Sequence, residues 1–525
     1  MRYKVFIPTA GIGSRLEELT KNLNKSLIGV VNKPIISHII EKFPKKCEFV
    51  IALGHKGELV KNYLELAYPE RVFKYIYVKP FKGKGSGLGY TLLSCKKYLQ
   101  QPFIFVSCDT LVTEKIPEPN DNWVGYSYIK NLNIYRTLEI KQKKLVSINE
   151  KGIKISKSSK AYIGLAGIFD YSKFWNSMKS GKQIAINQGE AYGLNGILKT
   201  KFIKPIKFSW FDTGNLKNLK NTQRAFMSKN EPNILEKKNE AIWFVNKKVI
   251  KFSVDKKFIN NRFIRAKKLK GFVPKVIDYK KNMYCYEKAR GVVLSNIVHP
   301  KLFKNLLQYC EKFWKKIKLE KKNFLLFKKK CRNFYYNKTR ERIKLFYKNF
   351  NKKDANEKIN GKAMPKLSVL LKKVDWEDIS NGHAGRFHGD FHFENILWQS
   401  NKKRFIFLDW RQDFAGDLLI GDIYYDLAKL LHGLIVSHDS VVKNEFKVKW
   451  NKANILISLN QKRKLKECEK IFYKWCVKND LSVKKIKILT AIIFLNIAAL
   501  HHYPYSLFLF ALGKSMLKEV LIKKI

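Results

Sequence analysis

The stretch that most constrains this chain is a polar loop followed closely by a hydrophobic strand. The loop, Arg-Phe-His-Gly-Asp-Phe-His-Phe-Glu-Asn, spans residues 386–395, and the apolar run 405–409 ends on one Asp. Phosphoryl transfer from ATP needs one carboxylate to accept a hydroxyl proton, and an Asn and a second Asp to hold Mg²⁺. We therefore expect Asp390 to be the base and Asn395 and Asp409 to be metal ligands. The alternative is a polar turn in which these residues only cap and pack.

This stretch resembles the motif of the aminoglycoside phosphotransferase and choline kinase family, a branch of the protein-kinase-like fold. Gly421-Asp422 and Asp426-Leu-Ala follow at the distance at which that family begins a helix. We expect these two acids to be caps and loop anchors rather than catalytic groups. The resemblance implies a two-lobed α+β domain that phosphorylates a small molecule with ATP and Mg²⁺.

The region before this motif predicts the smaller lobe of such a domain. Residues 242–245 and 248–252 are two strands joined by Asn-Lys, which indicates a hairpin. Lys251 resembles the strand Lys that holds the α- and β-phosphates in kinases. Residues 284–287 resemble the hinge, so Glu287 is expected at the ATP site.

The small lobe departs from the kinase pattern at one position. The helix after the strand Lys usually carries a Glu that pairs with it, but no Glu occurs between Glu240 and Glu287. Arg262 and Arg265 occupy the helix instead. Two alternatives stay open: another group holds Lys251, or this half is only a catalytically weak binding domain.

The start of the chain predicts a phosphate-binding loop. Residues 3–7 are a short apolar strand, and Gly11 and Gly13 follow in Ala-Gly-Ile-Gly-Ser-Arg-Leu. Glycines after a strand let backbone N–H groups turn towards phosphate. Leu16 stands where a Walker loop needs Gly-Lys and where a Rossmann loop needs its third Gly, so both are excluded.

Residues 10–25 resemble instead the signature of the sugar-phosphate nucleotidyltransferases, Gly-x-Gly-Ser/Thr-Arg-Leu, then Leu-Thr, then Pro-Lys. Leu-Thr lies at 19–20 and a Lys at 25, although Asn24 replaces the usual Pro. The resemblance implies that the loop amides, the Arg and the Lys hold a nucleoside triphosphate. The residues that take these roles are Gly11, Gly13, Ser14, Arg15 and Lys25.

The following residues alternate as βα units do. Strands at 49–53 and 75–78 flank a helix over 58–66, which predicts a parallel sheet with its ligand at the carboxyl ends of the strands. A glycine cluster at 83–89, including Gly85, lies where the resembled family has a loop for the base and ribose. A flexible surface loop is the alternative.

Two carboxylates are candidates for the metal of this half. The apolar run 102–106 leads to Asp109, which places a carboxylate near the end of a buried strand. Asp212 lies in Trp-Phe-Asp-Thr-Gly, the Trp-x-Asp-x-Gly context of the resembled family. Mg²⁺ binds few carboxylates together with phosphate oxygens and water. Structural turn roles for either Asp are the alternative.

The resemblance also implies a substrate pocket and a reaction. Residues 162–169 resemble the strand beneath the sugar-phosphate pocket, and residues 190–195 are candidates to line it. The reaction is attack of a substrate phosphate on the α-phosphorus of an NTP, with release of pyrophosphate. CTP or UTP is expected as the second nucleotide beside ATP.

The net charge of +61 raises a different possibility, an RNA-associated protein. Lysines are spread along the whole chain without one dense basic block, which is typical of codon bias in an AT-rich genome. We therefore expect small-molecule substrates and no specific nucleic acid. An RNA-binding protein would show tight, steeply salt-dependent binding.

Cysteines and apolar segments indicate the compartment. The eight cysteines show no CxxC pair, which argues against zinc and disulfides and fits a reducing cytosol. The first residues lack the apolar region of a signal peptide. Residues 490–513 carry no Asp, Glu, Lys or Arg, but His-His-Tyr-Pro-Tyr-Ser at 501–506 predicts a turn between two buried helices. We expect a cytoplasmic protein without a membrane span.

The two resemblances predict two fused domains. The first, 1–228, is an α/β nucleotidyltransferase domain with a mostly parallel, Rossmann-like sheet. The second, 238–525, is a kinase-like domain with a small lobe at about 238–290 and a helical large lobe at 291–525. We expect a bifunctional enzyme that phosphorylates a metabolite and then joins the phosphate to a nucleotide. The product would be an NDP-sugar or CDP-alcohol for surface polysaccharide; an active transferase alone is the rival.

Overall fold

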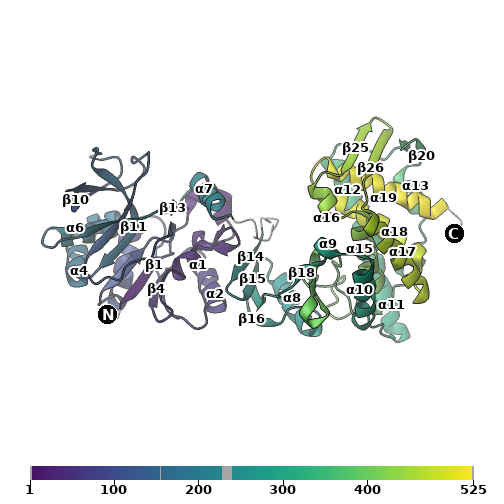
Figure 1. The fold of residues 1–525 in the computed structure, drawn as a ribbon, viewed down its shortest axis with the longest axis horizontal. Coiled ribbons are helices and arrows are strands. Elements are labelled where there is room, and N and C mark those ends of the chain that lie inside the picture. Colours follow the sequence, from purple (N-terminus) through teal and green to yellow (C-terminus); the bar gives the residue numbers. More distant parts are fainter. Residues whose placement is uncertain (1–2, 154, 228–238, 523–525) are drawn as a thin grey trace. The chain divides into compact units, whose positions relative to one another are not determined.

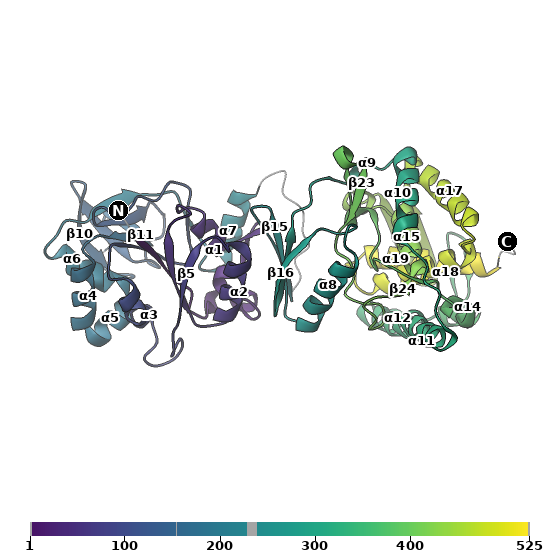
Figure 2. The same cartoon turned by 90° about the horizontal axis from the view of Figure 1, so that it is seen from below.

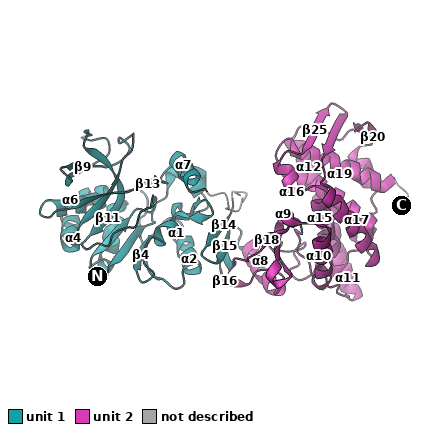
Figure 3. Ribbon diagram, in the orientation of Figure 1, with its two compact units in different colours: residues 1–256, 277–286 teal, residues 257–276, 287–525 magenta. Residues whose placement is uncertain are grey.

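The computed structural model describes residues 3–153, 155–227 and 239–522. These residues form two compact units, one of residues 1–256 and 277–286 and the other of residues 257–276 and 287–525 (Figure 3). The domain boundary predicted between 228 and 238 lies outside the described residues. The first unit extends past that boundary and includes most of the sheet that the sequence assigned to the second domain.

The first unit is built on a nine-stranded sheet with the main order β10-β9-β11-β6-β1-β4-β5 (Figure 1). Its centre, from β6 through β1 and β4 to β5, is parallel, and β11 joins β6 antiparallel. This arrangement confirms the predicted α/β class with a parallel centre. The strands are β1 (Lys4–Pro8), β4 (Glu48–Leu53), β5 (Val72–Tyr77), β6 (Phe103–Val106), β8 (Trp123–Ser127), β9 (Thr137–Lys141), β10 (Lys144–Asn149), β11 (Ser159–Ile168) and β12 (Lys204–Lys207).

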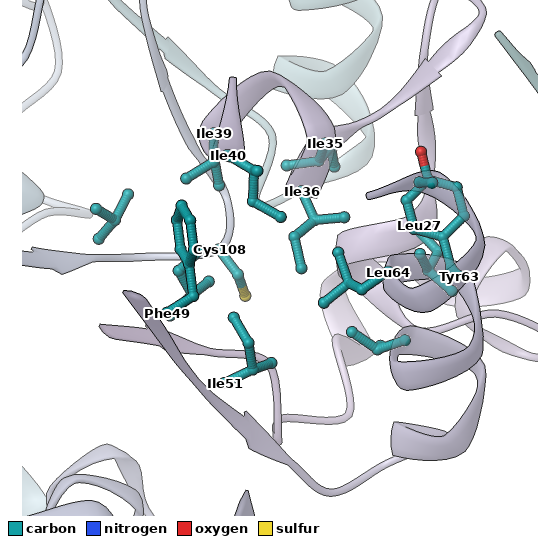
Figure 4. Close-up of a cluster of buried hydrophobic side chains, with 14 of the residues drawn as sticks. Leu27, Ile35, Ile36, Ile39, Ile40, Phe49, Ile51, Tyr63, Leu64 and Cys108 are labelled. Carbon is teal, nitrogen blue, oxygen red and sulfur yellow. The ribbon is translucent and has the colours of Figure 1, made fainter. Parts of the chain in front are cut away.

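The central strands are apolar runs because both of their faces are covered. Successive side chains alternate between faces, so Val5 and Ile7 enter one core and Phe6 enters the other. Helices α1 (Ile35–Ile40) and α2 (Gly57–Ala67) cover the first face, as Figure 4 shows. The opposite core takes side chains from α3 (Leu88–Cys95), α4 (Tyr171–Ser180), α5 (Lys182–Gln188) and α6 (Glu190–Leu198).

A second sheet, of order β14-β15-β17-β16, shares the core of the first unit. Trp243 of β14 meets Tyr63 of α2 edge to face, with ring centroids 5.1 Å apart. Lys280 of β16 pairs with Glu65 of α2 at 2.8 Å, and Lys248 Nζ donates to the carbonyl of Leu66 at 3.0 Å. The sheet lies beside α2 in both views (Figures 1 and 2). Its strands are β14 (Glu240–Val245), β15 (Lys248–Ser253), β16 (Val276–Lys280) and β17 (Met283–Glu287).

The second unit is mainly helical. Its small sheets are β18-β22-β23, β20-β19-β26-β25 and β21-β24. Their strands are β18 (Val292–Val293), β19 (Glu357–Ile359), β20 (Lys362–Met364), β21 (Ala384–Gly385), β22 (Ile396–Gln399), β23 (Arg404–Phe407), β24 (Gly421–Asp422), β25 (Phe446–Asn451) and β26 (Asn454–Leu459). Helix α8 (Lys256–Lys268) begins at the last residue of the first unit and otherwise belongs to the second. The other long helices are α10 (Pro300–Phe313), α11 (Lys321–Arg332), α12 (Lys338–Asn349), α15 (Ile423–Ile435), α17 (Arg463–Lys478), α18 (Val483–Ala498) and α19 (Tyr505–Ile522).

The apolar segment near the end forms two buried helices, as predicted. Helices α18 and α19 are separated by residues 499–504, and most of their side chains between Thr490 and Gly513 are buried. Over the described ranges, no helix is both long and apolar enough to cross a membrane. All eight cysteine thiols are free and buried.

Candidate active sites

The glycine loop of the first unit follows β1 and leads into a 3-10 helix, Ser14–Thr20. Gly13 has a φ of 74°, and a Cβ there would lie 3.0 Å from the Lys25 side chain and from the Thr20 methyl group. Only glycine fits this conformation beside Lys25 without displacing a neighbour. Gly11 is exposed with open space around it. The loop therefore stays open at Gly11 and is tightly folded at Gly13.

Asn24, which replaces the usual Pro, anchors the turn that carries Lys25. Its amide nitrogen donates to the carbonyls of Thr9 at 2.9 Å and His55 at 2.6 Å. Its side-chain oxygen accepts the backbone N–H of Ser26 at 2.9 Å and so caps the short helix Lys25–Leu27. The departure at 24 thus leaves Lys25 fixed by hydrogen bonds.

Lys25 forms an ion pair with Asp109, with Nζ 3.1 Å from Oδ2. Ser107 Oγ donates to the other oxygen of Asp109 at 2.5 Å. Burial alone would raise the pKa of Asp109, but Lys25 and Ser107 outweigh it and lower the pKa to about 2. Burial alone would lower the pKa of Lys25, but Asp109 raises it above its ordinary value. Both groups are therefore charged at neutral pH.

Asp212 is brought to Asp109 by a short strand pair. β13 (Trp210–Asp212) pairs with β7 (Thr110–Val112), which sets Asp212 opposite Thr110. The backbone N–H and the hydroxyl of Thr213 both donate to the carbonyl of Asp109 at 3.0 Å. Gly214 marks the meeting point, since a Cβ there would lie 3.0–3.5 Å from Asp212 Oδ1, Asp109 Oδ2 and an Arg15 guanidinium nitrogen.

The residues gathered at Gly214 fit a magnesium–triphosphate complex. Mg²⁺ takes one or two carboxylates and completes its shell with phosphate oxygens and water. Asp109 and Asp212 supply that number, and Arg15 and Lys25 add the positive charge that phosphates need. The structure thus brings together four of the residues singled out from the first half of the sequence.

Two side chains that hold Asp212 were not predicted. Tyr135 donates its hydroxyl to Asp212 Oδ2 at 2.8 Å, and Asn218 Nδ2 donates to the same oxygen at 2.5 Å. Asn218 lies in the first turn of α7 (Leu216–Phe226). Tyr135 lies 77 residues before Asp212, so no local pattern links the two.

The pocket residues predicted from the resemblance include a buried acid. Glu190 begins α6, and Arg136 approaches its carboxylate at 3.6 Å. Burial raises the pKa of Glu190 although Arg136 opposes the shift. Glu190 Oε2 and the Tyr162 hydroxyl have no hydrogen-bond partner among the described residues. Gly85 lies in the exposed loop before α3 with open space around it, so its role stays a prediction.

The loop of the second unit has the predicted order. Asp390 precedes a single 3-10 turn, Phe393–Asn395, and β22 (Ile396–Gln399) follows at once. Asn395 Nδ2 donates to the backbone carbonyl of Asp390 at 3.0 Å and to its Oδ2 at 3.3 Å. β23 (Arg404–Phe407) pairs antiparallel with β22 and ends two residues before Asp409.

Two cations hold the Asp390 carboxylate. Lys429 of α15 contacts Oδ1 at 2.7 Å, and His392 Nε2 lies 3.4 Å from Oδ2. Burial alone would raise the pKa of Asp390, but Lys429 and His392 hold it well below its ordinary value. Burial alone would lower the pKa of His392, but Asp390 and Glu394 raise it to about 9.

Lys429 was missed by the sequence reading. It lies on α15 among apolar side chains that are buried, from Leu427 to Leu431. A single Lys within such a run was the available signal, because a buried Lys needs an acidic partner. The sequence did not identify that partner, which lies 39 residues earlier in the chain.

Helix α8 explains the missing Glu. Arg262 forms an ion pair with Asp409, and Trp410 donates its indole N–H to the Arg262 carbonyl at 2.9 Å. Arg265 donates to the backbone carbonyls of Phe387 and Arg411. The helix therefore holds the loop 386–395 and Asp409 through arginines.

Asp426 and Asp422 are anchors, as predicted. Asp426 accepts the backbone N–H groups of His388 at 2.6 Å and Gly389 at 2.7 Å, and burial raises its pKa to about 6. Asp422 caps α15 by accepting the N–H of Tyr424 at 3.0 Å.

The two remaining predicted ATP ligands lie in different units. Lys251 is buried on β15 in the first unit. Glu287 ends β17 in the second unit, exposed, 3.6 Å from Lys275. Their roles at an ATP site stay predictions.

Comparisons with known proteins agree with both resemblances. Residues 349–447, which include Asp390, Asn395, Asp409 and Lys429, match the family model described as Phosphotransferase enzyme family. The N-terminal region is similar to the bifunctional protein GlmU of Methanococcus vannielii, at 29% identity over 171 residues. That match covers 31% of this chain and 40% of the relative.

GlmU of Methanocaldococcus jannaschii is 24% identical over 218 residues, which are 39% of this chain and 50% of that protein. The chain thus spans half or less of the length of these relatives. Among solved structures, CTP:phosphocholine cytidylyltransferase from Streptococcus pneumoniae has a TM-score of 0.36 at 16% identity, covering 43% of this chain and 100% of that one. UDP-glucose pyrophosphorylase from Acinetobacter baumannii has a TM-score of 0.37 at 14% identity, covering 43% and 93%.

The chain therefore combines a region similar to nucleotidyltransferases of the GlmU type with a later segment that matches the phosphotransferase enzyme family.

Proposed function

We propose that the chain is a bifunctional transferase that phosphorylates a hydroxylated metabolite with ATP and then joins the new phosphate to a nucleotide. The observation that carries the proposal is the gathering of charged groups in each unit. Arg15 and Lys25 meet two carboxylates in the first, and Asp390 meets Asn395 and Lys429 in the second. The product would be an NDP-sugar or a CDP-alcohol used in the cytoplasm for cell-surface polysaccharide.

In the first unit, the attacking group is a phosphate that is already ionised, so the reaction needs no general base. An oxygen of that phosphate forms a bond to the α-phosphorus of the NTP, and the bond to the β-phosphate oxygen breaks. Lys25 and Arg15 offset the negative charge that develops and hold the leaving pyrophosphate. Asp109 and Asp212 would hold Mg²⁺, which supplies further charge neutralisation when bound.

In the second unit, Asp390 accepts the proton of the acceptor hydroxyl as its oxygen forms a bond to the γ-phosphorus of ATP. The bond to the β-phosphate oxygen breaks, and ADP leaves. Lys429 and His392 orient the carboxylate and keep it ionised. Asn395 and Asp409 would hold Mg²⁺.

The test is a pyrophosphate-release screen of the whole chain. CTP, UTP, GTP and ATP are crossed with phosphorylated sugars and phosphocholine, and parallel wells hold the unphosphorylated acceptors with ATP. We expect turnover from an unphosphorylated acceptor only when ATP and a second nucleotide are both present. The absence of turnover from every compound, phosphorylated or not, would overturn the proposal.

A second candidate function is nucleotidyl transfer alone, with a second unit that only binds substrate. The contact of Arg262 with Asp409 favours it, because that arginine neutralises a predicted metal ligand. Under this alternative, only phosphorylated compounds release pyrophosphate, and ATP with the unphosphorylated acceptor forms no ADP.

A further inference from the structure

The surroundings of Asp390 carry a surplus of positive charge. Lys338 and Arg342 lie one turn apart on α12, so both face the same side of that helix. Lys338 Nζ lies 4.4 Å from the centre of the Phe334 ring, and the Arg411 guanidinium lies 4.9 Å from the same ring. The charges that act on Lys338 are those of Arg411, Arg342, Lys429 and Asp390, so cations from three separate segments gather beside Asp390.

The nearby acids already have partners. Asp390 is paired with Lys429 and His392, and Glu394 accepts from His392 Nδ1 at 2.8 Å. Within the part of the chain that the structure describes, no carboxylate lies within ion-pair distance of Lys338, Arg342 or Arg411. Three cations are therefore left without an acid beside a site that must admit substrates.

Besides burial, the nearby positive charges also lower the pKa of Lys338. Burial, followed by the positive charges of Arg411, Arg342 and Lys429, lowers its pKa to about 7, although Asp390 opposes the shift. An anion placed among these groups would remove the repulsion and restore the charged form. A cation placed there would add to the repulsion.

The two oxygens of Asp390 face different surroundings. Oδ2 faces Asn395, which we assign to the metal and hence to the nucleotide, whereas Oδ1 contacts Lys429. The acceptor hydroxyl must reach Asp390 from the side away from the nucleotide. That side is the one where α15 presents Lys429.

We propose that the acceptor of the second unit is an anion, a hydroxy acid or a hydroxylated phosphate, whose charged group binds among Lys338, Arg342 and Arg411. This inference rests on the proposed kinase function and deepens it by giving the charge of the substrate. It disfavours amino alcohols and amino sugars as acceptors.

The first test measures ADP formation by the whole chain with acceptors matched in shape but different in charge. Glucuronate, glucose and glucosamine form one set, and glycerate, 3-phosphoglycerate, glycerol and choline form another. We expect the anionic members to have the highest kcat/KM, by at least about tenfold. A higher kcat/KM for a neutral or cationic member would overturn the proposal.

The variant Lys338→Met assigns the effect to the cluster. We expect it to raise KM for the anionic acceptor about tenfold or more while KM for ATP changes less than twofold. Lys344→Met removes an exposed charge from the same helix and should change neither value. A rise in KM for ATP instead would show that the cluster serves the nucleotide, and an unchanged acceptor KM would show that it serves neither; each result overturns the proposal.

Binding separates this inference from the proposed function. Calorimetry of the whole chain with saturating AMP-PNP and Mg²⁺ compares the seven compounds without requiring turnover. If no compound yields ADP, the kinase function fails. Tighter binding of an anionic member that is lost in Lys338→Met would still support an anionic ligand, and equal or tighter binding of the neutral or cationic members would overturn it.

Discussion

Each unit contains an ion pair between a lysine and an aspartate, and the two pairs differ in surroundings. Lys25 lies 3.1 Å from Asp109, whose side chain is 18% exposed. Lys429 lies 2.7 Å from Asp390, whose side chain is 41% exposed. In both pairs the lysine keeps the carboxylate ionised against the effect of burial. An ion pair between a lysine and an aspartate therefore does not by itself determine which reaction a site supports.

The difference lies in the third group at each carboxylate. Asp109 is joined by Asp212 and Arg15, a set suited to a metal ion and a triphosphate. Asp390 is joined by the amide of Asn395 and by His392, a neutral donor and a cation, and we propose that it accepts a proton. We propose that the same kind of ion pair serves a metal ligand in one unit and a base in the other, and the following predictions test that contrast.

The largest effect is expected from Asp390→Asn. Loss of a general base lowers rates by roughly 10²–10⁴-fold, so ADP formation should fall by about 10³-fold. Pyrophosphate release from the phosphorylated acceptor should not change, because that step belongs to the first unit. The exposed Asp480→Asn is the matched control. A decrease of less than tenfold would show that Asp390 is not the base.

Asp109→Asn should lower pyrophosphate release by about 10²-fold or more, because one of the two carboxylates proposed to hold Mg²⁺ is lost. ADP formation should be unaffected in this variant, which is the reverse of the pattern expected for Asp390→Asn. Asp121→Asn removes an exposed carboxylate from the same unit and should have no effect. Equal loss of both activities would mean that the two sites do not act separately.

The two lysines should respond differently. Lys25→Met removes a group that we propose contacts the triphosphate, so nucleotidyl transfer should fall by about 10²-fold. Lys429→Met removes a positioning residue, so kcat for ADP formation should fall by only about tenfold. Because Lys429 lowers the pKa of Asp390, its loss should also shift the acid limb of the kcat/KM profile to higher pH.

Lys429→Arg keeps the charge and should leave that limb in place. An acid limb that does not move in Lys429→Met would mean that the lysine is only structural. Pyrophosphate release from the phosphorylated acceptor serves as the internal control for both variants of Lys429.

The smallest effect is expected from pH. Lys338 is charged below its pKa of about 7 and loses its charge above it. The kcat/KM for an anionic acceptor should therefore decrease by about tenfold as pH rises from 6 to 8. Burial and the charges of Arg411, Arg342 and Lys429 lower this pKa of Lys338, and Asp390 opposes them. The Lys338→Met variant should not show this decrease of kcat/KM between pH 6 and 8. If the variant still shows the decrease, another group causes it.

The elements that sequence reasoning found were those whose signal is local. The apolar runs of β1, β4 and β6 and the carboxylates at 109 and 409 follow from residues that are neighbours in the chain. Lys429, Tyr135 and Asn218 were missed because each acts through a partner distant in the sequence. The absence of the helix Glu was read correctly, but the contact of Arg262 with Asp409 needed the structure.

The sheet that carries Lys251 shows most clearly what could not be predicted from the sequence. Its strands and hairpin were predicted, because alternation and a two-residue turn are local signals. Its place in the core of the first unit depends on Trp243 meeting Tyr63, two residues 180 positions apart. Kinase-like spacing indicated a different partner, so the pattern identified the element without its packing.

The shared core of α2 and this sheet also bears on how such a gene can change. A recombination event or a gene split within codons 228–238 would separate Tyr63 and Leu64 from Trp243, Ile250 and Met283, although these side chains belong to one buried cluster. One product would display a bare apolar face, and the other would carry strands without their support. Exchange of intact modules between genomes is therefore expected to avoid breakpoints between codons 228 and 286, where residues 257–276 of the second unit lie between two parts of the first.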